Sequence, residues 1–125
     1  MESLYDKDNP NITVTLLLAR AYFEMKDDTR VVSLLESVRK QENAEANLLL
    51  GKSLYRLARS ADALPVLEAA MTSIGQTVEL LNPVGTSYLK LGKNDKGLPF
   101  LVRSLEVNPD QSEIRKVVEA ASKKP

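Results

Sequence analysis

Residues 51–67 read GKSLYRLARSADALPVL, and the same pattern of residue types occurs at two other places in the chain. Residues 19–35 read ARAYFEMKDDTRVVSLL and residues 85–101 read GTSYLKLGKNDKGLPFL, and both align with the first stretch without a gap. The three stretches all begin with a small residue, and these residues are spaced 32 and 34 positions apart. A period of this length is typical of a solenoid, in which each unit buries its apolar face only against its neighbours. We therefore expect a stack of similar units.

Matched positions of the three stretches carry the same kind of residue. At steps of three, twelve, sixteen and nineteen from the small residue, the recurring sets are Tyr22, Leu54 and Tyr88, then Val31, Ala63 and Gly97, then Leu35, Leu67 and Leu101, then Val38, Ala70 and Ser104. Apolar residues three and four positions apart indicate amphipathic helices. One such set is Val14, Leu17, Leu18, Ala21 and Met25. The sequence predicts an all-α chain of three helix pairs and a seventh helix, with spans near 12–25, 28–40, 44–58, 61–72, 78–91, 95–107 and 111–122.

The ends of these helices carry capping signals. A good N-cap residue stands nine positions after each small residue, and its side-chain oxygen is expected to accept a free amide of the following helix. These residues are Asp28, Ser60 and Asn94. Gly92 suits the left-handed residue that ends a helix. Asp110 and Glu113 are expected to form a capping box at the seventh helix.

Three prolines fall inside the expected helices. Pro65 and Pro99 stand at about the fifth helical position, where at most one backbone hydrogen bond is lost. Pro83 follows Asn82 within the helix expected at 78–91, and two outcomes remain open. The helix either kinks at Pro83, or it restarts with Asn82 as its cap and Pro83 in its first turn.

Composition and charge exclude several classes of partner. The chain has 125 residues and a mass of 13.8 kDa, which suits one domain. Its 17 basic residues balance 17 acidic ones, so the overall charge does not favour nucleic acid. No apolar run approaches the roughly 18 residues needed to cross a bilayer, and no secretory signal opens the chain. We expect no nucleic-acid partner and no membrane insertion. The compartment stays unknown, with the cytoplasm as the default expectation for a soluble chain.

Catalytic chemistry has little support in this sequence. The chain has no His and no Cys, so the commonest general base, metal ligand and thiol nucleophile are all missing. Gly51-Lys52-Ser53 matches the end of a phosphate-binding loop, but Ala46 replaces the first Gly of that motif and the triplet lies within an expected helix. We therefore expect a non-enzymatic chain that needs no metal or cofactor.

These recurring residues resemble three tetratricopeptide repeats. The resemblance rests on Leu18-Ala19, Tyr22, Val31, Leu35 and Val38, on Leu50-Gly51, Leu54, Ala63, Leu67 and Ala70, and on Val84-Gly85, Tyr88, Gly97, Leu101 and Asn108-Pro109. It implies a right-handed superhelical solenoid of three helix-turn-helix repeats followed by a C-terminal capping helix. The implied divisions are a leader or remnant of a preceding repeat at 1–11, repeats at 12–43, 44–77 and 78–110, and the capping helix at 111–125.

In tetratricopeptide arrays the first helix of each unit lines a concave groove that holds a protein or peptide. The resemblance places in this groove Thr13, Leu16, Arg20, Phe23, Glu24, Glu45, Leu48, Lys52, Tyr55, Arg56, Glu79, Asn82, Thr86, Leu89 and Lys90. The apolar track Phe23, Tyr55 and Leu89 would be flanked by the cations Arg20, Lys52, Arg56 and Lys90. Such a surface suits an acidic partner with apolar anchors. The alternative is that the aromatic rings partly pack within the superhelix and the cations are merely solvated.

The resemblance does not extend to the tetratricopeptide co-chaperones that hold a C-terminal carboxylate. Their clamp of Lys, Asn and Arg side chains is not matched here, because other residues occupy its positions. These are Leu16, Arg20, Leu49, Glu79 and Pro83.

Two functions remain open at this point. In the first, the chain is a protein–protein interaction module that binds its partner in the groove. In the second, it is a structural spacer or self-assembly segment of a longer array in a larger multidomain protein, with Leu4, Tyr5 and the first helix as its adhesive face. An array cut open exposes apolar surface that a neighbouring repeat would cover, so the second function leads us to expect a weak homodimer.

Overall fold

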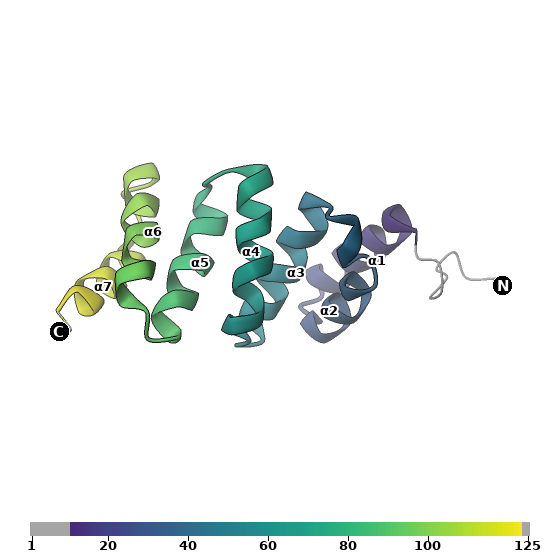
Figure 1. The fold of residues 1–125 in the computed structure, drawn as a ribbon, viewed down its shortest axis with the longest axis horizontal. Coiled ribbons are helices and arrows are strands. Elements are labelled where there is room, and N and C mark those ends of the chain that lie inside the picture. Colours follow the sequence, from purple (N-terminus) through teal and green to yellow (C-terminus); the bar gives the residue numbers. More distant parts are fainter. Residues whose placement is uncertain (1–10, 124–125) are drawn as a thin grey trace.

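The computed structural model describes residues 11–123, which form seven α-helices and one short 3-10 helix and no β-strand. The elements are α1 (Ile12–Glu24), α2 (Asp28–Glu36), η1 (Arg39–Gln41), α3 (Ala44–Arg56), α4 (Ser60–Ile74), α5 (Val78–Lys90), α6 (Asn94–Val107) and α7 (Ser112–Ser122). The helices follow one another along a single row from α1 to α7 (Figure 1). The predicted all-α solenoid is confirmed, and most helix ends lie within two residues of the expected positions.

Successive helices pack in pairs, which we call units 1, 2 and 3. The closest packing joins α1 to α2, α3 to α4 and α5 to α6, and each unit then packs on the next through α2–α3, α4–α5 and α6–α7. In addition, α1 contacts α3 and α3 contacts α5, whereas the second helices of neighbouring units approach each other less closely. The first helices therefore form the more tightly curved side, here called the inner face.

The turn within each unit has the same backbone geometry. Lys26, Ala58 and Gly92 all have positive φ angles, of 60°, 61° and 78°. In each turn the amide that follows this residue donates to a carbonyl of the helix before it, in the Schellman arrangement. These bonds run from Asp27 to Tyr22, from Arg59 to Leu54 and from Lys93 to Tyr88, each 2.9 Å long. The prediction for Gly92 is confirmed, and the same turn forms at two positions without glycine.

The expected N-caps were wrong by one residue. Asp28, Ser60 and Asn94 are the first helical residues, because the Schellman turn places the cap position directly after its left-handed residue. The cap positions are occupied by Asp27, Arg59 and Lys93. Of these three, the side chain of Asp27 accepts an amide, whereas the other two provide no side-chain cap.

The predicted capping box of α7 was also wrong. The helix starts at Ser112, and the residue before it, Gln111, gives no side-chain cap. The Gln111 side chain instead reaches back to α6, where its Nε2 donates to the carbonyl oxygens of Ser104 at 3.1 Å and Asn108 at 2.8 Å. Gln111 thus ties α7 to the end of unit 3.

The second helix of unit 1 is shorter than predicted. It ends at Glu36 rather than at residue 40, and the chain continues into the 3-10 helix Arg39–Gln41. The amides of Ser37 and Val38 bond to carbonyls three residues back, at 3.3 and 3.1 Å, which tightens the last turn. The chain then reverses at Glu42, which has a φ angle of 50°.

The prolines lie at equivalent places in three helices. Pro65, Pro83 and Pro99 are each the sixth residue of their helix, so each removes one backbone hydrogen bond close to the N-terminus. Helix α5 runs through Pro83 from Val78 to Lys90 without interruption. The proposal that the helix restarts at Asn82 was therefore wrong.

Small residues bring the two helices of a unit into close contact. A Cβ atom added at Gly51 would lie 2.6 Å from Cδ2 of Leu67, and one at Gly85 would lie 2.7 Å from Cδ2 of Leu101. In unit 1 the matching Ala19 is fully buried. The leucine of each second helix thus fills the space left above the small residue of the first helix.

We predict that replacing Gly85 by Leu destabilises the protein by about 1–3 kcal/mol or more, because the new side chain would overlap Leu101 and the backbone oxygen of Gly97. Thermal or denaturant unfolding followed by circular dichroism measures the change. The matched control is Ala69→Leu, which adds the same side chain at an exposed position of α4. Equal midpoints for Gly85→Leu and the wild type would contradict the helix packing described above.

Candidate functional site

Two ion pairs of the inner face follow the repeat. Nη2 of Arg20 donates to Oε1 of Glu45 at 2.6 Å, and Nζ of Lys52 pairs with Oε1 of Glu79. In both cases the cation directly follows the small residue of one unit, and the glutamate is the second residue of the first helix of the next unit. Unit 3 has Thr86 at the position of these cations. The series therefore stops before α7.

The Arg20–Glu45 pair alters the acidity of both groups. The hydrogen bond from Arg20 lowers the pKa of the Glu45 carboxyl below its usual range, against a smaller opposing effect of burial. The same bond raises the pKa of the Arg20 guanidinium. Because the folded-state pKa of Glu45 is lowered, the pair persists at pH values where an isolated glutamate begins to take up a proton.

A third ion pair joins units 1 and 2 at the edge of the inner face. Nε of Arg56 donates to Oδ1 of Asp28 at 2.9 Å, and Nη2 donates to the same oxygen at 2.5 Å. The guanidinium also lies over the Phe23 ring, 4.0 Å from its centroid. The Asp28 side chain is only 12% exposed, so this pair is better shielded from water than the others.

Lys90 repeats half of this arrangement one unit further along. Its Nζ lies 4.7 Å from the centroid of the Tyr55 ring, as Arg56 lies over Phe23. Among residues 11–123, however, no carboxylate pairs with Lys90. It is thus the unpaired member of the four cations predicted for the groove.

An apolar pocket of about 270 Å³ opens on the inner face between α3, α5 and α7. Its lining residues are Lys52, Tyr55, Arg56, Glu79, Asn82, Pro83, Thr86 and Ile114. Nδ2 of Asn82 donates to Oε1 of Gln111 at 2.8 Å, which fixes α7 beside α5. The pocket therefore joins predicted groove residues of units 2 and 3 with one residue of α7.

The structure places the other predicted groove residues in different environments. Thr13 and Glu24 are exposed, and Leu48 and Leu89 are half-buried. Leu16 is 8% exposed and belongs to the hydrophobic core, because its side chain turns toward the packed interior. Its placement on an accessible groove was therefore wrong.

The alternative for the aromatic rings and cations holds in part. Phe23 and Tyr55 are half-buried and pack against the core, as the alternative required. The cations, in contrast, are not merely solvated. Three of them are engaged in the ion pairs above, so the four cations do not form a free positive stripe.

Sequence reasoning missed three residues of this region. Asp28 was expected to cap a helix, Pro83 was considered for its effect on the helix and as a departure from the co-chaperone clamp, and Ile114 was not placed in the groove. Asp28 and Ser60 each stand nine positions after a small residue, and Arg56 and Lys90 each stand five positions after the small residue of the next unit. This shared register was present in the repeat alignment and could have indicated the contact.

Two further classes of site find no support in the part of the chain that is described. Within residues 11–123, no three acidic, His or Cys side chains gather as they would around a metal ion. Over the same range, every helix is too short or too polar to cross a bilayer.

Comparison with known proteins places this fold. No protein-family model matches the chain, and no curated protein matches it in sequence. A MamA mutant structure aligns with a TM-score of 0.85 and 21% identity, covering 94% of this chain and 70% of that one. A MamA AMB-1 structure gives 0.85 and 20%, covering 94% and 71%, and a MamA MSR-1 structure gives 0.83 and 21%, covering 94% and 69%. The chain has the TPR-like helical repeat fold of MamA. At these identities, the likeness establishes the fold alone.

We predict that Asp28→Asn lowers the free energy of unfolding by about 1 kcal/mol, because it leaves Arg56 without its shielded partner. Denaturant unfolding measures the change. The control is Glu106→Gln, which breaks an exposed pair with Arg103 within α6 and is expected to cost less than about 0.5 kcal/mol. If both variants lose the same free energy of unfolding, the Asp28–Arg56 pair stabilises the fold no more than an exposed ion pair does.

Proposed function

We propose that this chain is a non-enzymatic protein-interaction module of the tetratricopeptide type, which holds a peptide or protein partner on its inner face. The observation that carries the proposal is the apolar pocket between α3, α5 and α7. The likeness to MamA supports a helical repeat scaffold, and it leaves the partner open.

The size of the pocket fits one side chain of a partner. Pockets that enclose drug-sized ligands span about 300–1,000 Å³, so a space of about 270 Å³ is better suited to a single apolar anchor. The Tyr55 ring, Pro83 and Ile114 provide apolar walls, while Lys52 and Glu79 lie at the rim as an ion pair. A peptide with one aliphatic or aromatic anchor is the occupant that this chemistry favours.

The paired cations change the expected electrostatics of binding. Because Arg20, Lys52 and Arg56 are balanced by carboxylates, they contribute little to long-range attraction of an acidic partner. Replacing Lys52 or Arg56 by an acidic residue would break an ion pair between units, so the stability of the fold and the affinity for a partner would change together. Tyr55 is therefore the better residue for testing the pocket.

We predict that Tyr55→Ala raises the dissociation rate of a bound peptide roughly fivefold or more, equivalent to about 1 kcal/mol, with little change in association rate. Peptides are first selected from a displayed random library against the wild-type chain, and their kinetics are then measured by surface plasmon resonance. The matched control is Tyr22→Ala. Tyr22 is also a half-buried tyrosine, but it lies in unit 1, outside the pocket. The proposal fails if both variants release the selected peptides at the same rate.

One observation favours self-assembly as a second function. Leu17 and Leu18 on α1 are 57% and 37% exposed. The matching positions of unit 2, Leu49 and Leu50, are buried in the core that unit 2 shares with unit 1. Leu4 and Tyr5, also assigned to this adhesive face, lie outside the described residues. The exposed face of α1 thus presents apolar surface whose counterpart in unit 2 is covered.

We predict that the chain forms a weak dimer through this face of α1. Sedimentation velocity at increasing protein concentration is expected to show a rising average mass, and Leu17→Glu is expected to abolish the rise. Val102→Glu places the same charge on another exposed apolar position, on α6, and is expected to leave it intact. A wild-type chain that stays strictly monomeric into the high micromolar range would rule out this second function.

A further inference from the structure

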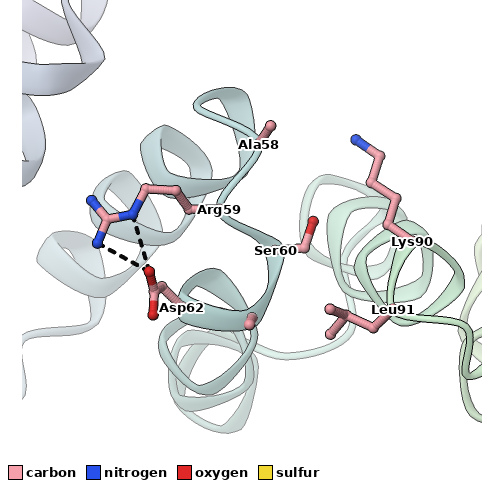
Figure 2. A pocket seen from close by; sticks show the side chains of 7 residues that line it. Ala58, Arg59, Ser60, Asp62, Lys90 and Leu91 are labelled. Carbon is pink, nitrogen blue, oxygen red and sulfur yellow. Dashed lines mark hydrogen bonds and ion pairs between the residues drawn. The ribbon is translucent and has the colours of Figure 1, made fainter.

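We propose that a second pocket, where the N-terminus of α4 meets the C-terminus of α5, binds an oxyanion, which is a carboxylate or phosphoryl group carried by a partner. The pocket has a volume of about 310 Å³. Its lining residues are Ala58, Arg59, Ser60, Ala61, Asp62, Lys90 and Leu91. Figure 2 shows the side chains of Ser60 and Lys90 on opposite sides of this space. We call it the junction pocket.

The start of α4 offers backbone donors. The amide of Ala63 bonds to the carbonyl of Arg59 at 2.9 Å, but within residues 11–123 the amides of Ser60, Ala61 and Asp62 have no acceptor. Arg59 stands at the N-cap position and provides no side-chain cap. Free amides at the positive end of a 15-residue helix favour an anion.

Ser60 adds a side-chain donor directed into the pocket. The residue is only 7% exposed, and its hydroxyl makes no hydrogen bond within residues 11–123. Its oxygen points toward the space between Ala58 and Lys90 (Figure 2). The Ser60 oxygen is not one of the fully buried unpartnered atoms, so it reaches the pocket and is available to donate to a bound oxyanion.

The repeat itself shows which group is missing. Ser60 occupies in unit 2 the position of Asp28 in unit 1, and Lys90 occupies in unit 3 the position of Arg56 in unit 2. At the first junction the Asp28 carboxylate binds Arg56, which lies over an aromatic ring. At the second junction Lys90 lies over the matching ring, and Ser60 brings no carboxylate. An external oxyanion would take the place of the Asp28 carboxylate.

The charges around the pocket leave Lys90 available. Two cations and one carboxylate line the pocket, and the carboxylate, on Asp62, accepts from Nε of Arg59 at 3.0 Å. Figure 2 shows this pair on the side of the helix start away from Lys90. Asp62 weakens the attraction for an anion near Arg59, so the expected position of the anion is between Ser60 and Lys90.

Titration with small anions tests the site directly. The amide signals of Ser60, Ala61 and Asp62 in ¹H–¹⁵N NMR spectra are followed while sodium acetate or inorganic phosphate is added, each against sodium chloride at equal ionic strength. We expect saturable shifts of these signals that chloride does not produce. A response to acetate points to a carboxylate as the natural group, and a stronger response to phosphate points to a phosphoryl group. Free anions probe the junction pocket whether or not a peptide binds at the apolar pocket.

Two variants make the test specific. Ser60→Asp supplies the missing carboxylate from the chain itself, so it is expected to abolish the anion response and to raise the thermal midpoint. Lys90→Gln is expected to weaken binding roughly tenfold, through loss of one charge-assisted bond. Lys93→Gln removes an exposed cation of the next turn, outside the pocket, and is expected to change nothing. The proposal is overturned if the wild type shows no saturable response, if chloride acts equally, or if Ser60→Asp and Lys90→Gln respond like the wild type.

Discussion

The close approach of two helices at one small residue governs this structure. At Gly51 and Gly85 there is no room for a Cβ atom, because the leucine sixteen positions later occupies that space. This contact fixes how the two helices of a unit cross, and therefore how far one unit is displaced from the next. Because this displacement is constant, matched residues of the first helices lie at the same place relative to the next unit. The regular inner face follows from this packing.

Because each unit is displaced from the next in the same way, residues at matched positions of the repeat make the same contacts between units. It places a glutamate beside the cation of the preceding unit, as in Arg20–Glu45 and Lys52–Glu79, and a cation over the preceding aromatic ring. Such contacts pair three of the four predicted groove cations, Arg20, Lys52 and Arg56, with carboxylates of the chain itself. Positions that break the pattern are then informative, because they leave a group without the partner that its counterpart has. Thr86 and Ser60 are two of these positions.

The helices were predictable because apolar periodicity reports local structure, and it needs no knowledge of the neighbouring units. The N-caps were wrong by one residue because backbone bonds in the Schellman turn, rather than side chains, set where each second helix begins. The ion pairs and the burial of Leu16 were not predicted, since both depend on how one helix is placed against another. The pocket at Ile114 was missed because α7 lies outside the repeat alignment.

Tyr55 connects the apolar pocket with the junction pocket. Tyr55 lines the apolar pocket, and Nζ of Lys90, which lines the junction pocket, lies 4.7 Å from the centroid of its ring. An anchor that shifts this ring therefore also shifts the cation, and an anion that draws Lys90 away removes a contact from the ring. By thermodynamic linkage the two effects are equal and reciprocal. A partner that presents an apolar side chain and an oxyanion on one segment would engage both pockets, and the first contact would raise the effective concentration for the second. Selectivity for a partner would then arise from the apolar pocket and the junction pocket, while the ion pairs around them maintain the shape of the solenoid.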